Sequence, residues 1–392
     1  MLKSFYFYSI LINKKQDLKI AINTRLLLKN RLEGIGWFTY ESLKRITTQH
    51  PEHEFLFLFD RPFSEDFIFS KNITPLVLFP QARHPFLYYL FFEHAVPAVL
   101  KKHKANLFLS PDGYLSLSSP TPSIQVIHDL NFEHYPENIP FFNRHYYRYY
   151  FPRFAQKAKR IACVSEYTKQ DIVKTYHIAP EKIDVVYNGA NEKYAPISKL
   201  EIEQTQKKYS QNYPYFLFVG ALNPRKNIGN LFRAFDAFKK SHSSNFKLVI
   251  VGEKMLWTSD IENAFNNMQF KNEVIFTGHL NPDELKYIYA SAHALTYVPI
   301  FEGFGIPIVE AMYCDVPVIT SNVTSMPEIS GNATLLVDPF SIDSIKNGML
   351  ALAKDEMLKE SLIKKGRIRR QDFNWQKTAD RLWECICTVQ GL

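Results

Sequence analysis

The sequence predicts an α/β protein with two doubly wound, Rossmann-like domains that face each other across a cleft. From Leu18 onward, short apolar runs alternate with longer amphipathic stretches, which is the pattern of β-α units on a parallel sheet. The same rhythm begins again after a polar stretch at 198–212, and 392 residues suffice for two domains. Ligands of such sheets bind at the carboxyl ends of the strands, so the cleft is the expected site.

The first half of the chain contains the apolar runs of one sheet. In order they are LKIAIN, EFLFLF, TPLVLF, NLFLS, SIQVIHD, RIACVS and KIDVVYN, in a domain that we place at residues 18–197. Residues 1–17 hold a short apolar run that falls well short of the ~20 residues of a spanning helix and lacks a small-residue cleavage site. We expect an N-terminal extension that is peripheral or disordered, or a misassigned start.

The second half repeats the pattern with YFLFVG, FKLVIVG, EVIFTG, HALTYV, VPVIT and ATLLV, and with helical stretches between them. We place this domain at residues 198–372. Residues 373–392 contain FNWQKTADRLWECI, which predicts an amphipathic helix with no strand after it. Such a helix is free to pack on either domain, including back on the N-terminal one.

The composition favours an anionic partner. The formal net charge is +8, which suits nucleotide phosphates, a lipid headgroup surface or nucleic acid. The four cysteines lie in apolar contexts without a zinc pattern or a disulfide framework, so a reducing cytoplasm is favoured. No clustered His, Cys or Asp-x-Asp pattern in the sequence indicates a metal site.

The segment FEGFGIPIVEAM contains two glutamates, Glu302 and Glu310, that are eight positions apart. On one uninterrupted helix they would lie roughly 80° apart and would not share a face. Because Pro307 suits the first turn of a helix, the helix is expected to begin near Gly305 or Ile306. Glu302 then lies on the preceding loop, and Glu310 lies about one turn into the helix.

The helix start of this segment suits a diphosphate. Gly303 and Gly305 would let a ligand approach the backbone closely. The N–H groups of Phe304, Gly305 and Ile306 would present a positive dipole end to an anion.

The two glutamates then suit the two ends of the ligand. Glu310 lies one turn, ~5.4 Å, from the helix start, so it could accept hydrogen bonds from ribose hydroxyls. Glu302 could hold hydroxyls of the group that the diphosphate carries. The alternative is a tight turn with two solvent-facing acids.

Several segments occur in a characteristic order from about residue 18 to the C-terminus: RLEGIGWFTYE, VIHDLNFEHYPE, VSEYTKQDI, VVYNGAN, FVGALNPRKN, VIFTGHL and FEGFGIPIVEAMYCDVPVITSN. In this order they resemble retaining glycosyltransferases of the GT-B architecture, the family 4 type also described as glycosyl transferases group 1, and in particular a mannosyltransferase-like branch. The last segment is specific, whereas a bare G-x-G is common in unrelated α/β proteins.

The resemblance implies transfer of a hexose, such as mannose from GDP-mannose, from a GDP- or UDP-linked sugar to a glycan or lipid-linked glycan. Glu302 is expected to act in catalysis with two cations, Arg225 and Lys226, which follow the strand YFLFVG. Fixed cations there would stabilise the charge on a leaving diphosphate, a role that the resemblance implies especially for the lysine. Many relatives carry an arginine where this chain has Ala221, so Arg225 is assigned as its substitute; solvated charges are the alternative.

On the N-terminal side, His128 ends the strand SIQVIHD and could hydrogen-bond a sugar hydroxyl and support positive charge at the anomeric carbon. A structural histidine is the alternative. Asp129, the next residue, is a further candidate for the site, and an Asx-turn or a helix N-cap is its alternative. Ser165 with Glu166 predicts a helix N-cap and an early-turn acid, and Glu328 either bears on the site or begins a short helix.

Other expected contacts use the backbone. Gly34 and Gly36 are placed on the loop after LKIAIN, which the resemblance implies closes over the donor phosphate and the acceptor. Arg25, nearby, could meet an anionic acceptor. Gly278 through Leu280 are expected to contact the nucleobase.

The resemblance also implies retention of configuration by front-face attack, with the leaving phosphate taking the acceptor's proton. No second carboxylate in the sequence suits a covalent nucleophile. We expect no cofactor beyond the nucleotide sugar, which is the substrate, and no metal, since cations and a helix end can neutralise the phosphates.

The stretch FFNRHYYRYYFPRFAQKAKR, at 141–160, mixes aromatic and basic residues at helix-like spacing. An ordinary helix with buried aromatics and solvated cations is favoured. Contact with a membrane interface is second, because acceptors of many related enzymes are lipid-linked, and nucleic acid is third and not expected, because no recognition motif accompanies the stretch. The protein is therefore expected in the cytoplasm, with peripheral contact at the inner face of the membrane as an open possibility.

Two other functions stay open on the sequence. One is a nucleotide-sugar epimerase of the same two-domain architecture, which needs no acceptor. The other is a non-catalytic glycan- or RNA-binding protein, against which the combination of Arg225, Lys226, Glu302 and Glu310 counts.

Overall fold

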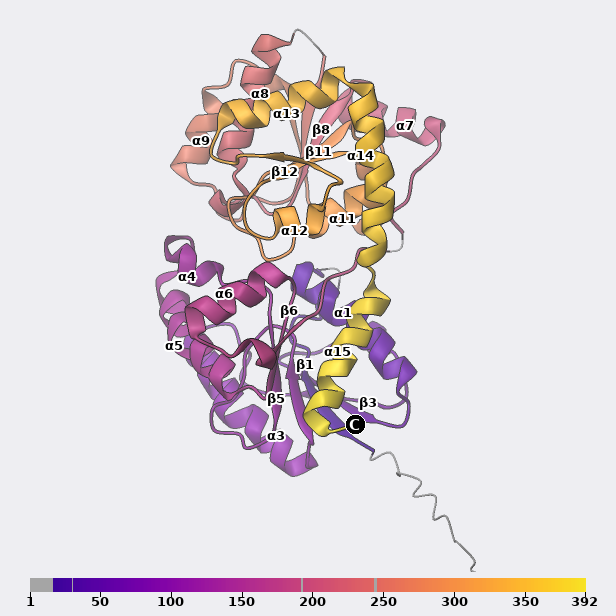
Figure 1. The fold of residues 1–392 in the computed structure, drawn as a ribbon. Helices are drawn as coiled ribbons and strands as arrows, with labels where there is room; N and C mark the ends of the chain where they lie inside the picture. The colour runs from indigo at the N-terminus through magenta and orange to yellow at the C-terminus, as the bar shows by residue number, and fades with distance from the viewer. Residues whose placement is uncertain (1–16, 30, 192, 243–244) are drawn as a thin grey trace, which may run out of the picture.

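The computed structural model describes residues 17–29, 31–191, 193–242 and 245–392. The expected extension at 1–17 lies, except for its last residue, outside the described residues. Two α/β domains stand one above the other in Figure 1, with α11 and α12 at the lower edge of the second domain and α4 and α6 at the upper edge of the first. The prediction of two Rossmann-like domains is confirmed.

The first domain is built on a seven-stranded sheet in the order β3-β2-β1-β4-β5-β6-β7. Its strands, all paired in parallel, are β1 (Lys19–Asn23), β2 (Glu54–Phe59), β3 (Ile73–Val77), β4 (Leu107–Ser110), β5 (Ser123–Ile127), β6 (Arg160–Cys163) and β7 (Ile183–Val185). Its helices are α1 (Gly34–Gln49), α2 (Pro85–Leu90), α3 (Val96–His103), α4 (Asn131–His134), α5 (Phe141–Lys157) and α6 (Glu166–Tyr176).

The second domain has a six-stranded parallel sheet in the order β10-β9-β8-β11-β12-β13. The strands are β8 (Tyr215–Val219), β9 (Lys247–Val251), β10 (Val274–Gly278), β11 (Ala294–Tyr297), β12 (Val318–Ser321) and β13 (Leu335–Val337). The helices are α7 (Lys199–Ser210), α8 (Ile228–Ser241), α9 (Ser259–Asn266), α10 (Pro282–Ala290), α11 (Ile306–Tyr313), α12 (Met326–Ser330), α13 (Ile342–Lys354), α14 (Glu356–Arg369) and α15 (Trp375–Gln390).

Helices cover both faces of the first sheet, which is why its strands are continuous apolar runs. On one face, the layer of α2, α3, α5 and α6 buries Phe92, Phe154 and Ile172. On the other face, α1 buries Phe38 and Leu43. The strand order turns back between β1 and β4, and between β8 and β11 in the second sheet, and ligands of such sheets bind at these switch points.

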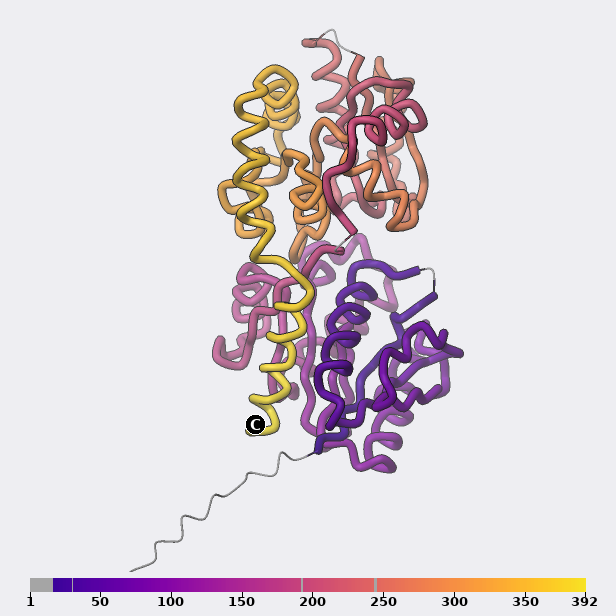
Figure 2. Tube along the Cα trace, turned by 90° about the vertical axis from the view of Figure 1, so that its right-hand side faces the viewer, coloured from indigo at the N-terminus to yellow at the C-terminus, as the bar shows by residue number. Residues whose placement is uncertain are grey.

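The last helix, α15, belongs to the second half of the chain but packs on the first domain. It lies beside α1 (Figure 1, Figure 2) and contributes Trp375, Leu382 and Ile386 to that domain's core. Where the chain returns to the first domain it passes very close to Gly189, since a Cβ at Gly189 would lie 2.4 Å from the backbone nitrogen of Trp375. Thr378 also donates its hydroxyl to the carbonyl of Tyr187 at 2.7 Å.

Among the described residues, none of the helices combines the length and the apolar character that crossing a bilayer needs.

Replacing Leu382, which is fully buried, with alanine is expected to destabilise the protein by about 3 kcal/mol, because the change leaves a cavity between α15 and the first domain. Urea unfolding measures this loss. The neighbouring Arg381→Ala, at an exposed side chain, is the control and should change the unfolding free energy by less than about 0.5 kcal/mol. Equal effects of the two variants would contradict the packing described for α15.

Candidate active site

Glu302 lies at the centre of a charged cluster at the carboxyl end of β11. Its Oε2 accepts hydrogen bonds from the guanidinium of Arg225 at 3.0 Å, from the hydroxyl of Tyr297 at 3.0 Å, and from the ammonium of Lys226. Both cations come from a 3-10 turn, Pro224–Lys226, that follows β8. The cations that the sequence places after the first strand of this domain therefore face the glutamate that follows its fourth strand.

The cluster is held in place by the backbone around it. Arg225 donates to the carbonyl of Phe301 at 3.1 Å, and its own carbonyl accepts the N–H of Ile300 at 3.0 Å. Asn227, in a left-handed conformation, ends the 3-10 turn and donates to the carbonyls of Val298 at 3.0 Å and Pro339 at 2.7 Å. The cations and the glutamate are thus fixed relative to each other before a ligand binds.

Burial alone would raise the pKa of Glu302. The charges of Lys226 and Arg225 outweigh that effect, and with the hydrogen bond from Tyr297 they hold the pKa at about 2. Glu302 is consequently ionised at neutral pH. All three donors bind its Oε2, whereas no described residue donates to its Oε1.

Gly303 allows the loop to touch the N-terminal domain. A Cβ at this position would lie 1.8 Å from the carbonyl oxygen of His128. The carbonyl of Gly303 accepts the hydroxyls of Ser165 at 2.6 Å and Thr168 at 3.3 Å. The close approach that the sequence suggests for a ligand is made here by the backbone of the other domain.

Gly305 and the start of α11 form the expected helix end. Gly305 has φ +95°, and a Cβ there would lie 2.7 Å from Cε of Met326. The helix begins at Ile306 with Pro307 in its first turn, which confirms the predicted start. In the described part of the chain, no hydrogen bond takes up the N–H groups of Phe304, Gly305 or Ile306. These amides can bind an anion.

Some expected donor-binding positions offer only backbone. The side chain of Phe304 is buried against Tyr187 and Phe373, so only its N–H is available. Gly278 ends β10 with φ +73° and has open space where a Cβ would point. Leu280, two residues on, packs against the core of its own domain.

Glu310 lies one turn into α11, in surroundings unlike those of Glu302. The hydroxyl of Tyr289 donates to its Oε2 at 2.7 Å, and the hydroxyl of Tyr194 is a second hydrogen-bond partner. Burial raises the pKa of Glu310 to about 7, even though these hydrogen bonds favour the ionised form.

His128 and Asp129 follow β5 on the N-terminal side of the site. The Nε2–H of His128 donates to the carbonyl of Pro111 at 2.8 Å, which leaves Nδ1 as the acceptor. Burial lowers the pKa of His128, so the ring is neutral at pH 7. Asp129 accepts the N–H of Asn131 at 3.0 Å, the Asx geometry, while its other oxygen lies 3.8 Å from Arg225.

The first turn of α1 completes the site from the N-terminal domain. The prediction of a loop at Gly34 and Gly36 is wrong, because both lie in the first turn of α1, where Glu33 is the N-cap without a side-chain hydrogen bond. A Cβ at Gly34 would meet Cδ1 of Ile306 at 3.9 Å. The N-termini of α1 and α11 therefore approach each other from the two domains.

Arg25 does not face an anionic acceptor. It is buried, forms an ion pair with Asp112 at 2.5 Å, and stacks on the ring of Tyr114 at 4.3 Å. Its charge is neutralised inside the N-terminal domain.

Helix α6 binds the second domain at its N-terminus. Glu328, in α12, accepts the N–H groups of Glu166 at 2.8 Å and Tyr167 at 2.9 Å. Ser165 caps the same helix by accepting the N–H of Thr168 at 3.0 Å, as predicted. Glu328 is thus an interdomain contact at the start of a short helix.

Three residues of the site were not singled out from the sequence: Tyr297, Asn227 and Ser325. Tyr297 is the last residue of β11, so its place at the carboxyl end of a strand was a usable signal. Ser325 donates its hydroxyl to the carbonyl of Glu302 at 2.8 Å. Neither Ser325 nor Asn227 carries a local sequence signal for these long-range contacts.

The described residues include one group of histidine and acidic side chains close enough to hold a metal ion, His50, Glu52 and His53. The group precedes β2 and so lies at the amino edge of the sheet, opposite the site. Nδ1 of His53 already accepts the N–H of Leu18 at 3.2 Å.

Two family models match this chain. Residues 33–194 match the model described as Glycosyltransferase Family 4, and residues 201–369 match Glycosyl transferases group 1. O-antigen chain mannosyltransferase B of Escherichia coli is 28% identical over 378 residues, which cover 93% of this chain and 96% of that protein. O-antigen chain mannosyltransferase RfbU of Salmonella typhimurium is 32% identical over 259 residues, 66% of this chain and 68% of that protein.

Solved structures share the fold. WaaG, a glycosyltransferase involved in lipopolysaccharide biosynthesis, superimposes with a TM-score of 0.73 at 15% identity, covering 93% of this chain and 98% of that chain. Anabaena Alr3699/HepE in complex with UDP and glucose superimposes with a TM-score of 0.74 at 15% identity, covering 96% and 100%. The two-domain GT-B architecture is therefore shared.

The raised pKa of Glu310 predicts a pH-dependent effect on stability. Between pH 4.5, the ordinary pKa of a glutamate, and about pH 7, the folded state keeps a proton on Glu310 that the unfolded state has released. The free energy of unfolding therefore falls as pH rises through this window. Glu310→Gln removes the buried charge and should stabilise the protein at pH 8 by up to about 3 kcal/mol, with the gain vanishing near pH 4.

Urea unfolding at the two pH values measures this effect. Glu262→Gln, at an exposed position of α9, is the matched control and should change little at either pH. A Glu310→Gln variant that is less stable than the parent at pH 8 would show that the carboxylate is favourably paired there.

Proposed function

We propose a mannosyl transfer reaction for this chain, which belongs to the GT-B glycosyltransferases that carry a Glycosyltransferase Family 4 domain followed by a Glycosyl transferases group 1 domain. The proposed donor is a nucleotide sugar, GDP-mannose first, and the proposed acceptor is a glycan or lipid-linked glycan of the O-antigen type. The names of the two relatives above, both O-antigen mannosyltransferases, support this choice.

The single observation that carries transfer is the cluster of Glu302 with Arg225 and Lys226 beside the free amides at the start of α11. A diphosphate placed at these amides would meet two fixed cations, which stabilise negative charge as the glycosidic bond breaks. Glu310, one turn away, suits the ribose hydroxyls. Glu302 suits the hydroxyls of the sugar.

The N-terminal side suits the reacting end of the donor. His128 is neutral, with its Nδ1 as an acceptor, so it can bind a sugar hydroxyl without opposing positive charge at the anomeric carbon. Glu302 is ionised but bound by three donors, which disfavours it as a covalent nucleophile. We therefore propose retention by front-face attack, in which the acceptor hydroxyl gives its proton to the departing phosphate oxygen.

We place the enzyme in the cytoplasm, where nucleotide sugars are made, in peripheral contact with the inner face of the membrane. Cys163, Cys314 and Cys385 are buried as free thiols, which suits a reducing compartment. We propose no cofactor and no metal, so activity should persist in the presence of EDTA.

A donor screen followed by product analysis tests the proposal. Thermal shifts over GDP, UDP and their sugars identify the donor, because a ligand that binds the folded state raises its stability. Free nucleoside diphosphate that forms only with an acceptor supports transfer. Interconversion of two nucleotide sugars without an acceptor would establish the epimerase alternative, and tight glycan binding without turnover would establish the non-catalytic one.

Lys226→Ala and Glu302→Gln are each expected to lower kcat by about 10²–10³-fold, because each removes a preorganised charge next to the diphosphate or its sugar. Initial rates of nucleotide release measure the loss, and circular dichroism checks the fold. Lys271→Ala, an exposed lysine in a surface turn, is the control and should keep full activity. Full activity in both active-site variants would refute the proposed roles of Lys226 and Glu302.

A further inference from the structure

Two segments of the N-terminal domain collect exposed aromatic side chains: 79–89, which runs from the end of β3 into α2, and 141–149, at the start of α5. In the described residues of this domain, the large hydrophobic side chains that are more than a third exposed all lie in these segments: Phe79, Phe86, Tyr89, Phe141, Phe142 and Tyr149. Phe79, Phe142 and Phe86 are 72%, 66% and 64% exposed. We call these six residues the aromatic surface.

The two segments meet in space. The ring of His84 lies 6.0 Å from that of Phe142, and beneath them Tyr88 of α2 packs on Tyr146 of α5 at 5.4 Å. The two segments that carry the aromatic surface therefore lie side by side, on two neighbouring helices.

Helix α5 has two aromatic faces. Tyr146, Phe151 and Phe154 are buried, as the ordinary-helix interpretation of this stretch predicts. Phe141, Phe142 and Tyr149 recur on the opposite side of the same helix and remain exposed. The ordinary-helix interpretation accounts for the core residues and for Tyr147 and Tyr150, which pack against the core. It does not account for the three exposed rings, because folding gives no reason to display them together.

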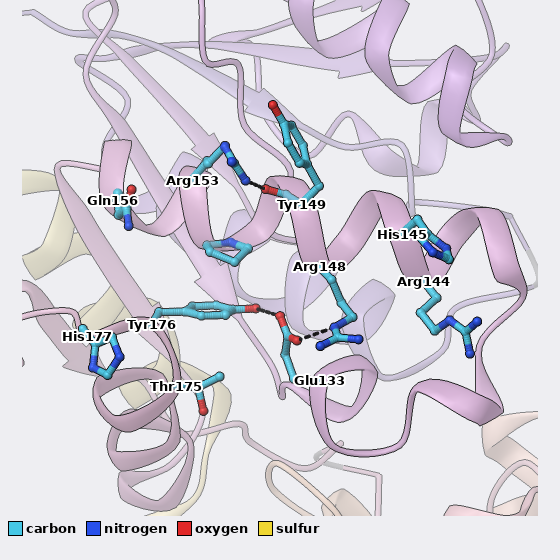
Figure 3. Close-up of a pocket in the computed structure, with 11 residues that line it drawn as sticks. Glu133, Arg144, His145, Arg148, Tyr149, Arg153, Gln156, Thr175, Tyr176 and His177 are labelled. Atoms are coloured by element: carbon cyan, nitrogen blue, oxygen red, sulfur yellow. Dashed lines mark hydrogen bonds and ion pairs between the residues drawn. The ribbon is translucent and has the colours of Figure 1, made fainter.

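Arginines border the aromatic surface. Arg144, Arg148 and Arg153 line a cavity of about 580 Å³ between α5, α4 and the end of α6, shown in Figure 3. The carboxylate in this cavity, Glu133, is already occupied by Arg148 at 3.1 Å and by the hydroxyl of Tyr176 at 3.1 Å. Arg144 and Arg153 have no carboxylate partner among the described residues. Each donates to a backbone carbonyl and lies over an aromatic ring, Phe141 at 5.5 Å and Tyr149 at 3.7 Å, so their remaining N–H groups can bind an outside anion.

We propose that the aromatic surface docks the protein on an anionic lipid bilayer, with its phenyl rings inserted at the acyl boundary and Arg144 and Arg153 bound to headgroup phosphates. Aromatic rings flanked by arginines match this interface, where one side of the contact is apolar and the other anionic. Single-stranded nucleic acid binds grooves that follow its backbone, whereas the outer side of a helix is convex.

The position of the surface suits the proposed acceptor. The segments follow β3 and β5, so they begin at the carboxyl edge of the sheet, which also bears His128. A bilayer docked here would present a lipid-linked glycan beside the cleft. Only the presentation of a lipid-linked acceptor rests on the proposed function. Binding of the aromatic surface to lipid needs neither the sugar donor nor the acceptor.

Co-sedimentation of the full chain with vesicles tests the proposal. The protein should bind vesicles of phosphatidylethanolamine and phosphatidylglycerol, bind phosphatidylcholine weakly, and lose affinity with added salt. Phe142→Ser is expected to lower the partition coefficient about 10-fold, and Phe141→Ser with Phe142→Ser on the order of 100-fold. Arg144→Gln with Arg153→Gln should remove the preference for phosphatidylglycerol.

Phe340→Ser is the matched control, because Phe340 is 63% exposed on the second domain and should not affect vesicle binding. Three results would overturn the proposal: no binding of the parent protein to anionic vesicles, equal loss in the Phe340→Ser variant, or unchanged binding in the Phe141/Phe142 variant. If the parent protein does not bind vesicles and the Phe141/Phe142 variant loses self-association, the surface binds a second copy of the chain instead. If that variant loses single-stranded RNA binding, the surface binds nucleic acid instead. Mannosyl transfer measured with a soluble acceptor should be unchanged in the phenylalanine variants, so failure of either proposal is recognised separately.

Discussion

The arrangement of the whole site depends on one steric constraint, the absence of a side chain at residue 303. The loop after β11 reaches the N-terminal domain with its backbone against the carbonyl of His128, where any Cβ would clash at 1.8 Å. Ser165 and Thr168 then bind the carbonyl of Gly303. Because the loop is fixed there, Arg225 lies 3.0 Å from Glu302 of its own domain and 3.8 Å from Asp129 of the other. A larger residue at position 303 would separate the site groups of the first domain from those of the second.

The two glutamates of the FEGFGIPIVEAM segment have opposite electrostatic environments although they are eight positions apart. Cations hold the pKa of Glu302 at about 2, whereas burial among tyrosines raises that of Glu310 to about 7. One carboxylate is thus permanently charged beside the proposed site of bond cleavage. The other can ionise or stay protonated near neutral pH, so a hydrogen bond to a ligand can be made from either form.

The sequence predicted the fold well because strands buried on both faces are continuous apolar runs, and every strand of the structure falls on one of them. Lys226 and Glu302 were expected at the site because each follows a strand, which brings such residues to one edge of the sheet, and because the segments that contain them resemble those of a known family. Gly34 was placed on a loop because no capping side chain marks the start of α1. The contacts of Ser325 and the outward face of α5 depend on tertiary packing, and the sequence pattern does not distinguish one aromatic side of a helix from the other.

The C-terminal helix α15 makes the first domain discontinuous in sequence. Its sheet is complete by β7, yet Trp375, Leu382 and Ile386 of its core are among the last residues of the chain. During synthesis, the domain that leaves the ribosome first must therefore keep an apolar face of α1 exposed until the end of translation. The polypeptide also passes between the domains twice, and the two passages touch each other at Gly189 and Trp375.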